Sequence, residues 1–258
     1  MSTTSTARTA GELRALVGGG AERVAAVEAA QTEPGHAEPG RAAYDTRVHA
    51  AREALRWAAE TFGDQLTVAS SMGDEVLVHL VGTTIPGADV FFLDTGYHFA
   101  ETLGTRDAYA AMLPISIRTV VPQQTVAEQD AEHGPRLHER NPDLCCALRK
   151  VVPLEQALSD HQAWVTGMRR EDAPTRTDID LVGWDDRRQM VKLNPLAAWT
   201  QDDLDRYVDE HRVFLNPLRQ SGFASIGCAP CTRPVAEGED PRAGRWAGKN
   251  KTECGLHT

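Results

Sequence analysis

The chain has 258 residues, of which 41% are hydrophobic, so it can bury a sizeable core and is not an intrinsically disordered protein. Its 37 acidic and 27 basic residues give a net charge of −10, which argues against nucleic acid as the main partner. No apolar run is long enough to span a membrane, and the N-terminus lacks the apolar stretch of a secretory signal. We therefore expect a cytoplasmic protein, in whose reducing surroundings a CxxC pair binds metal or does redox chemistry rather than forming a structural disulfide.

The first 42 residues are rich in Ala, Gly, Thr and Glu, and they contain the run Gly18-Gly19-Gly20. Short helices are expected at Glu12–Val17 and Ala21–Ala30, within a segment that is otherwise flexible or peripheral. From Thr46 to Phe62 the apolar residues recur at helical spacing. An amphipathic helix is therefore expected near the start of the ordered domain.

Strands and helices then alternate. The expected strands cover 65–70, 88–93, 115–121 and 163–168, and the expected helices between them cover 74–81, 99–112 and 143–159. This order predicts an α/β fold with an open, mostly parallel sheet and helices on both faces. A strand over 188–193 and a helix over 200–211 are expected next, and residues 212–258 read as irregular.

Ligands of such sheets bind outside the carboxyl ends of the strands, so the loops at those ends are candidate binding loops. In the first loop, Ser70 and Ser71 precede Met72-Gly73-Asp74, and backbone N–H groups there could face a phosphate or sulfate. The alternative is an ordinary helix capped by serine. In the second loop, Asp94 could orient a ribose or the loop itself, with Thr95 beside it, and Gly96 permits a close backbone approach.

Two adjacent arginines, Arg169 and Arg170, follow the strand expected at 163–168. They could make paired hydrogen bonds to phosphate or sulfate oxygens. The alternative is a surface ion pair with Glu171 or Asp172.

The five cysteines carry the strongest signal. Two tight pairs, Cys145-Cys146 and Cys228-x-x-Cys231, form a plausible ligand set. Adjacent thiols on a helix point about 100° apart, which is awkward for tetrahedral zinc but suits the separate corners of an iron–sulfur cluster. The pattern therefore favours a [4Fe–4S] cluster over zinc. Lys150, one turn after Cys146, could offset the cluster's charge or simply face solvent.

The remaining cysteine, Cys254, lies in a basic stretch near the end of the chain. Residues 241–258 carry four cations and one carboxylate, namely Arg242, Arg245, Lys249, Lys251 and Glu253. Such surroundings favour a thiolate nucleophile, and His257 could share one face of a turn with it. A solvated tail with an unused cysteine is the alternative.

Together these motifs resemble one family. CC…CxxC, Leu93-Asp94-Thr95-Gly96, Gly167-Met168-Arg169-Arg170, the stretch from Gly238 to Trp246 and the terminal Glu253-Cys254-Gly255-Leu256-His257 are similar to assimilatory adenylyl-sulfate (APS) reductases of the iron–sulfur, thioredoxin-dependent type, within the phosphoadenylyl-sulfate (PAPS) reductase superfamily. The resemblance runs from about Tyr44 to Thr258 and implies an adenine nucleotide α-hydrolase-like (PP-loop) fold. The loop at Ser70 departs from the SGG-x-D form of the ATP-cleaving relatives.

The resemblance implies that Cys254 attacks the sulfur of APS, that AMP leaves, and that thioredoxin then releases sulfite. It further implies that Lys150, Arg242 and Arg245 contact the sulfate and phosphate oxygens, with Arg169, Arg170 and His257 as further cations. We expect three parts in the chain: a flexible segment 1–42, which lies outside the resemblance, a nucleotide and cluster domain 43–232 and a mobile catalytic tail 233–258. A homo-oligomer is possible.

Three alternatives stay open at this point. A relative acting on 3′-phosphoadenylyl sulfate would share the tail but lack the CC/CxxC ligands. An ATP-cleaving adenylyltransferase of the same fold would not need Cys254. A zinc-bound adaptor would have no enzymatic activity.

Overall fold

The computed structural model describes residues 8–30, 40–249, 251 and 253–256. Six strands form one sheet in the order β3-β2-β1-β4-β6-β5. The strands are β1 (Leu66–Ser70), β2 (Asp89–Leu93), β3 (Ser116–Val120), β4 (Ala163–Val165), β5 (Val182–Asp185) and β6 (Met190–Leu193). The pairs β1–β4, β2–β3 and β4–β6 are parallel, and only β5 is seen to run antiparallel, against β6. The predicted α/β class with a mostly parallel sheet is confirmed.

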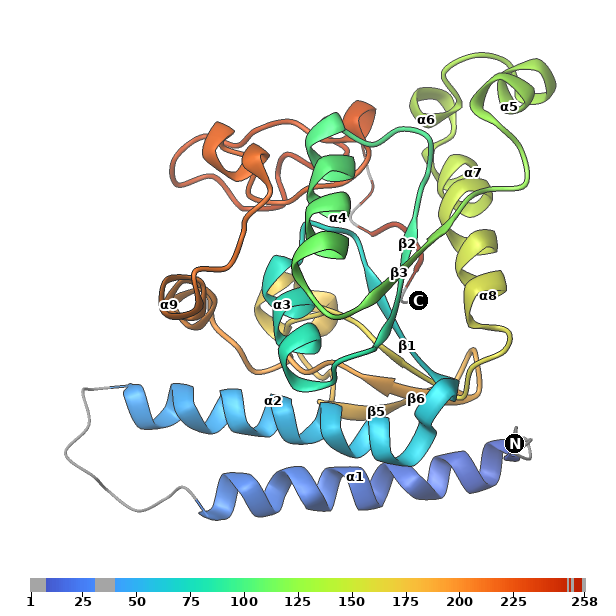
Figure 1. Ribbon diagram of the computed structural model, residues 1–258. Helices are drawn as coiled ribbons and strands as arrows, with labels where there is room; N and C mark the ends of the chain where they lie inside the picture. Colours follow the sequence, from blue (N-terminus) through green and yellow to red (C-terminus); the bar gives the residue numbers. More distant parts are fainter. Residues whose placement is uncertain (1–7, 31–39, 250, 252, 257–258) are drawn as a thin grey trace. The chain divides into compact units, whose positions relative to one another are not determined.

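Helices separate most of the strands (Figure 1). The α-helices are α1 (Ala10–Ala30), α2 (Arg41–Phe62), α3 (Glu75–Thr84), α4 (Ala100–Met112), α5 (Val126–His133), α6 (Leu137–Arg140), α7 (Pro142–Cys146), α8 (Val152–Leu158) and α9 (Gln201–His211). No helix within these described ranges has the length and apolar content that a bilayer span requires.

The chain forms two compact units, each made of two separate stretches. The first unit contains the residues up to Val68 and Asp160–Arg206, and the second contains Ala69–Ser159 and the residues from Tyr207 onward. The structure does not test the functional division into 1–42, 43–232 and 233–258, which stays a prediction.

In the first unit, α1 packs against α2 (Figure 1). The two short helices predicted before residue 31 are wrong, because α1 runs without a break through the three glycines. The reason is a close contact at Gly20, where an added Cβ would lie 2.8 Å from the Trp57 ring. The ion pairs of Arg23 with Glu53 and Glu60 also join the two helices. Tertiary contact therefore offsets the low helix propensity of glycine.

In the second unit, β2 is almost entirely buried and pairs in register with β3 from Asp89–Ser116 to Leu93–Val120. The helix predicted over 143–159 is wrong as a single α-helix. It consists of α7, a π-helical turn at Ala147–Val151, and α8. Pro153 explains the break, since proline lacks an N–H and its ring clashes with the carbonyl four residues earlier, whereas a wider turn accommodates it.

Gly18→Ala and Gly20→Ala should shift stability in opposite directions. Nothing lies within 4 Å of a Cβ added at Gly18, so alanine there should stabilise the fold by about 0.5–1 kcal/mol through helix propensity. At Gly20 the methyl group would collide with Trp57, so the same change should destabilise by about 1–3 kcal/mol. Urea unfolding of both variants measures this. Equal shifts would contradict the close packing of α1 on α2.

Candidate active site

The first cysteine pair is placed by the end of a short helix. Asn141 caps α7 by accepting a hydrogen bond from the backbone N–H of Leu144 at 3.0 Å. Cys145 and Cys146 end this helix, and both are buried. The π-helical turn follows at once, and such turns occur often at functional sites.

The second pair lies on an irregular segment fixed by its backbone. The N–H of Ala229 donates to the carbonyl of Tyr97 at 2.7 Å, and the N–H of Cys231 donates to the carbonyl of Cys228 at 2.9 Å. The hydroxyl of Thr95 lies 3.3 Å from the sulfur of Cys228. The loop after β2 therefore holds the CxxC segment in place.

All four cysteines line one pocket. The other residues that line it come from the loop after β2, the region of α6 to the π-turn, and the C-terminal segment: Tyr97, His138, Pro142, Arg149, Lys150, Pro230 and Trp246. The thiols are free, since no disulfide joins them. The structure thus brings together the four cysteines that the sequence singles out, and their role as a ligand set stays a prediction.

The electrostatics of the pocket disfavour four unliganded thiolates. Burial raises the pKa of Cys145 to about 12, and the neighbouring thiolates of Cys146, Cys228 and Cys231 contribute to this rise. Burial likewise raises the pKa of Cys146 and, with the charge of Cys228, that of Cys231. A bound metal group would replace the protons and relieve this repulsion.

The donor set is compatible with an iron–sulfur cluster. Among the described residues, no three His, Cys, Asp or Glu side chains meet closely enough to hold one metal ion. A tetrahedral zinc needs all its sulfurs about 2.3 Å from one point, whereas a cubane binds each cysteine at a different iron. Four free cysteines around one pocket, with cations beside them, are compatible with the second case.

Lys150 lies in the π-turn and faces the sulfur atoms. Desolvation works against its charge and Arg245 repels it, but the thiolates of Cys228, Cys254 and Cys146 together raise its pKa. Lys150 therefore keeps its proton at neutral pH and presents it to the anionic side of the pocket.

Arg149 is a site residue to which the sequence analysis assigned no role. It is buried, it donates to the carbonyl of Thr95 and, at 3.2 Å, to that of Gln124, and its guanidinium lies 5.4 Å from the centre of the Tyr97 ring. A Cβ at Gly96, which has φ +72°, would lie 3.1 Å from Arg149. Its position directly before Lys150 was the sequence signal that could have pointed to Arg149.

The loop after β2 is thus a structural support for the cysteines. Asp94 accepts a hydrogen bond from the N–H of Gly96 at 2.9 Å, and so orders the loop that carries Thr95. Of the two roles considered for Asp94, orienting the loop is the one with an observed contact. Contact of these residues with a ligand stays a prediction.

Arg245 joins the C-terminal segment to the CxxC segment. Its Nη1 donates to Ser225 Oγ at 3.1 Å and to the carbonyl of Ile226 at 3.3 Å. A Cβ at Gly227 would lie 2.3 Å from its guanidinium, so a side chain at that position would displace the guanidinium. The N–H of Trp246 donates to the carbonyl of Cys231 at 2.9 Å. Contacts on two sides therefore fix the position of Arg245 beside the cysteines.

Cys254 lies in the same charged environment. It is close enough to Lys150, Arg245 and Cys146 to interact with each of them electrostatically. Glu253, next to it, pairs with Arg242 at 3.4 Å. His257, predicted as its catalytic partner, lies outside the described residues, and its role stays a prediction.

Two lysines attach the tail to the α6–α7 region. Lys249 Nζ donates to the carbonyls of His138 at 2.7 Å and Glu139 at 3.2 Å. Lys251 forms an ion pair with Asp143. The basic stretch is therefore not simply a solvated tail, because its cations have specific partners.

The loop after β1 uses its serines internally. Met72 N donates to Ser70 Oγ at 3.1 Å, and Gly73 N donates to Ser71 Oγ at 3.4 Å. The N-cap of α3 is Asp74, without a side-chain cap, so the alternative of a helix capped by serine is wrong. The serines shape a tight loop whose ligand contacts stay a prediction.

Arg169 and Arg170 belong to the first unit. Arg169 is largely buried and pairs with Asp172 at 2.8 Å and with Glu171 at 3.3 Å, as in the ion-pair alternative. Arg170 donates to the carbonyl of Ile179 at 2.9 Å. Both arginines thus have partners within their own unit, and their contact with a substrate stays a prediction.

A family model described as the phosphoadenosine phosphosulfate reductase domain matches residues 65–234. The chain belongs to this family. An adenosine 5′-phosphosulfate reductase of Streptomyces coelicolor is 61% identical over 207 residues, covering 80% of this chain and 88% of the relative. The enzyme of the same name from Mycolicibacterium smegmatis is 55% identical with the same coverage.

Solved structures agree on the fold. A phosphoadenylyl-sulfate (PAPS) reductase from Candida auris, in a phosphate complex, aligns with TM-score 0.61 at 27% identity, over 78% of this chain and 100% of that one. An FMN adenylyltransferase from Candida glabrata aligns with TM-score 0.57 at 14% identity, over 86% of this chain and 74% of that one, which shows the fold alone. The predicted PP-loop type of nucleotide-binding fold is confirmed.

Asp74→Asn should remove a pH dependence of stability. Desolvation raises the pKa of Asp74 to about 6, with the Ser70 hydrogen bond opposing and the charge of Glu75 adding to the rise. The unfolded carboxyl titrates near 3.9, so the native state holds this proton more tightly and wild-type stability should fall as pH rises from about 4 to about 6. An amide at this position does not ionise, so the variant should gain up to about 2 kcal/mol on wild type across this range.

The measurement is urea unfolding of both proteins at several pH values. A difference between them that stays constant from pH 4 to pH 7 would contradict the raised pKa.

Proposed function

We propose that the chain is an adenylyl-sulfate reductase, an oxidoreductase that converts APS to sulfite and AMP with thioredoxin as electron donor. The reaction passes through an S-sulfocysteine on Cys254 and serves assimilatory sulfate reduction leading to cysteine biosynthesis, in the cytoplasm. The observation that carries this proposal is the gathering of four cysteines and Lys150 around one pocket, with Cys254 close enough to interact electrostatically with Lys150, Arg245 and Cys146. The 61% identical relative that bears this enzyme's name supports it.

The substrate brings a phosphate and a sulfate, so the nucleophile and its target are both anionic. Cations must offset this repulsion in a partly desolvated site. Lys150 lines the cysteine pocket, hydrogen bonds hold Arg245 beside the CxxC segment, and Arg242 pairs with Glu253, the neighbour of Cys254. In the proposal these three residues contact the sulfate and phosphate oxygens.

The nucleotide side is assigned to the loops after β1 and β2, two strands that are neighbours in the sheet. Ser70 and Ser71, with the Asp94-Thr95-Gly96 loop, hold the adenosine phosphate, because parallel sheets bind ligands outside the carboxyl ends of their strands. Arg169, Arg170 and His257 complete the proposed set.

The chemistry is a transfer of a sulfuryl group followed by reduction. The Cys254 thiolate forms a bond to sulfur, and the bond from sulfur to the phosphate oxygen breaks, so AMP leaves with that electron pair. A thioredoxin thiolate then attacks Cys254 Sγ, and sulfite leaves with the electrons of the S–S bond. The second thioredoxin thiolate resolves the mixed disulfide, which oxidises thioredoxin by two electrons and regenerates Cys254.

The proposed cofactor is a [4Fe–4S] cluster held by Cys145, Cys146, Cys228 and Cys231. When bound, it supplies fixed charge beside Lys150 rather than electrons, because both electrons come from thioredoxin. The chain's own residues bind the substrate, neutralise its charge and deliver the nucleophile.

Cys254 must meet APS in one step and thioredoxin in the next, so the tail has to close and open. Backbone contacts from Trp246 to Cys231 and from Arg233 to Gly244 attach the chain up to Trp246 to the cysteine segment. In the proposal, movement of the predicted 233–258 tail is therefore concentrated in the residues beyond Trp246. The contacts of Lys249 and Lys251 hold the closed position.

Cys254→Ser should abolish sulfite release while APS still binds, because serine lacks the nucleophilic thiolate and leaves the cations in place. Intact-mass analysis after anaerobic incubation with APS, without thioredoxin, should show one sulfonate adduct on wild type and none on the variant. Cys231→Ser is the control for loss of a thiol as such, because it removes a cysteine other than the proposed nucleophile. Normal turnover by Cys254→Ser would rule out the assigned nucleophile.

The anaerobically purified protein should be brown and contain about four irons per chain, because four cysteines around one pocket suit a cubane. Iron, sulfide and zinc analysis, with an absorption spectrum, measures this. A colourless protein with one equivalent of zinc would contradict the cluster. Kinetics with APS and with 3′-phosphoadenylyl sulfate on the same preparation separate the two substrate classes.

A further inference from the structure

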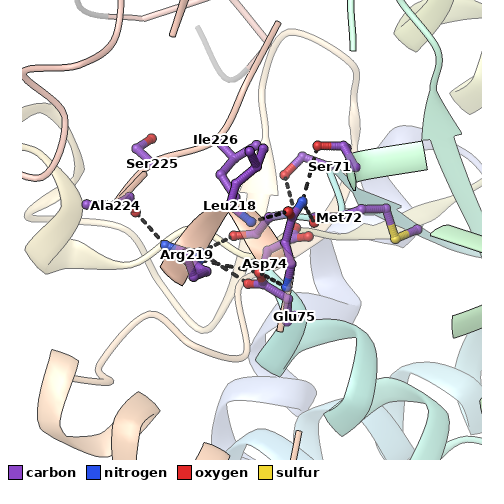
Figure 2. A network of polar contacts seen from close by, with 12 residues as sticks. Ser71, Met72, Asp74, Glu75, Leu218, Arg219, Ala224, Ser225 and Ile226 are labelled. Atoms are coloured by element: carbon purple, nitrogen blue, oxygen red, sulfur yellow. Dashed lines mark hydrogen bonds and ion pairs between the residues drawn. The ribbon is translucent and has the colours of Figure 1, made fainter. Parts of the chain in front are cut away.

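A network of polar contacts lies between the loop after β1 and the segment that leads to Cys228 (Figure 2). Both belong to the second unit. At its centre is the ion pair of Glu75 with Arg219. The side chain of Glu75 is only 3% exposed, and its carboxylate accepts from Arg219 Nη2 at 3.1 Å and Nε at 3.3 Å. The backbone N–H of Asn216 adds a third donor at 3.1 Å.

The same guanidinium also binds two backbone carbonyls. Arg219 Nη2 donates to the carbonyl of Gly73 at 2.5 Å, and Nη1 donates to that of Ala224 at 2.5 Å. Gly73 belongs to the loop after β1, and Ala224 lies four residues before Cys228. One planar group thus joins the loop, the first turn of α3 and the cysteine segment.

Two further contacts connect the same stretches. Asn216 Nδ2 donates to the carbonyl of Met72 at 3.3 Å, and Met72 has a left-handed backbone with φ +57°, which is costly for a side chain of this size. A Cβ at Gly73 would lie 3.1 Å from the Cβ of Ile226. The conformation of the loop is therefore imposed from outside it, by the segment 216–226.

We propose that Arg219 is a positioning residue, which holds the loop Ser70–Asp74 in its substrate-binding conformation and in fixed register with the segment that carries Cys228. The inference rests on the proposed function, in which this loop contacts the nucleotide of APS. Arg219 itself does not touch the substrate. It acts through the carbonyl of Gly73 and the carboxylate of Glu75.

Lysine cannot take over this role. Its ammonium keeps the charge that Glu75 needs, but it is a point donor and cannot span the carboxylate and two carbonyls as the planar fork of arginine does. Arg219→Lys therefore separates neutralisation of a buried carboxylate from positioning of the loop. The chain offers a matched control in Arg47, whose side chain is 28% exposed and pairs with the 6% exposed Asp203, against 30% and 3% for Arg219 and Glu75.

The experiment compares holoenzyme preparations of wild type, Arg219→Lys and Arg47→Lys. We expect Arg219→Lys to raise the KM for APS about tenfold with kcat within about twofold, because a displaced loop loses ground-state and transition-state contacts alike. Arg47→Lys should leave both constants unchanged, with a comparable shift in Tm. A KM of Arg219→Lys within about twofold of wild type, or equal changes in both variants, would overturn the proposal.

Calorimetric titration with AMP measures nucleotide binding, and so tests the role of Arg219 independently of the proposed reaction. If wild type binds AMP but forms no sulfite from APS, the proposed function fails, and the AMP affinities of the two variants still decide the role of Arg219. If Arg219→Lys does not fold, the double variant Glu75→Gln/Arg219→Gln removes both charges and should show the same weakened binding. Wild-type affinity in that variant would overturn the proposal.

Discussion

The gathering of four cysteines around one pocket is the constraint on which this part of the structure depends. Burial raises the pKa of Cys145, and the neighbouring sulfurs of Cys146, Cys228 and Cys231 add to that rise, so ionised or metal-bound sulfurs here need compensating positive charge. Such a site is stable only if cations are built in beside the sulfurs. Lys150 and Arg245 meet this demand, and neither is an ordinary surface charge.

Fixing those cations determines much of the local backbone. Lys150 lies in the π-helical turn that Pro153 forces on the helix, directly after Cys146. Arg245 lies against Gly227, where only glycine leaves room for a guanidinium beside the CxxC segment. The sulfurs and the cations are thus carried by the same short stretches of backbone.

Patterns of residue type predicted the sheet, the cysteine set and the basic tail, because each has a local signature. Helix α5 was not predicted, although the capping box of Thr125 and Glu128 can be recognised in the sequence. The unbroken α1 could not be predicted from local sequence, since the glycine at position 20 makes room for the Trp57 ring of another helix. The burial of Arg149 likewise depends on residues distant in sequence.

The division of the second unit into a nucleotide side and a sulfur side is less sharp than the motifs suggested. Thr95, expected on the nucleotide side, touches Cys228, and the loop after β1 is bound through Gly73 and Arg219 to the chain that leads to the same cysteine. Because the loops share these contacts, a shift in one loop strains the contacts of the other. The shared contacts therefore hold the loops in one arrangement. Under the proposed function, in which Cys254 must reach a doubly anionic substrate, such sharing would keep the cations, the loop after β1 and the sulfurs at fixed mutual distances during the proposed movement of the tail.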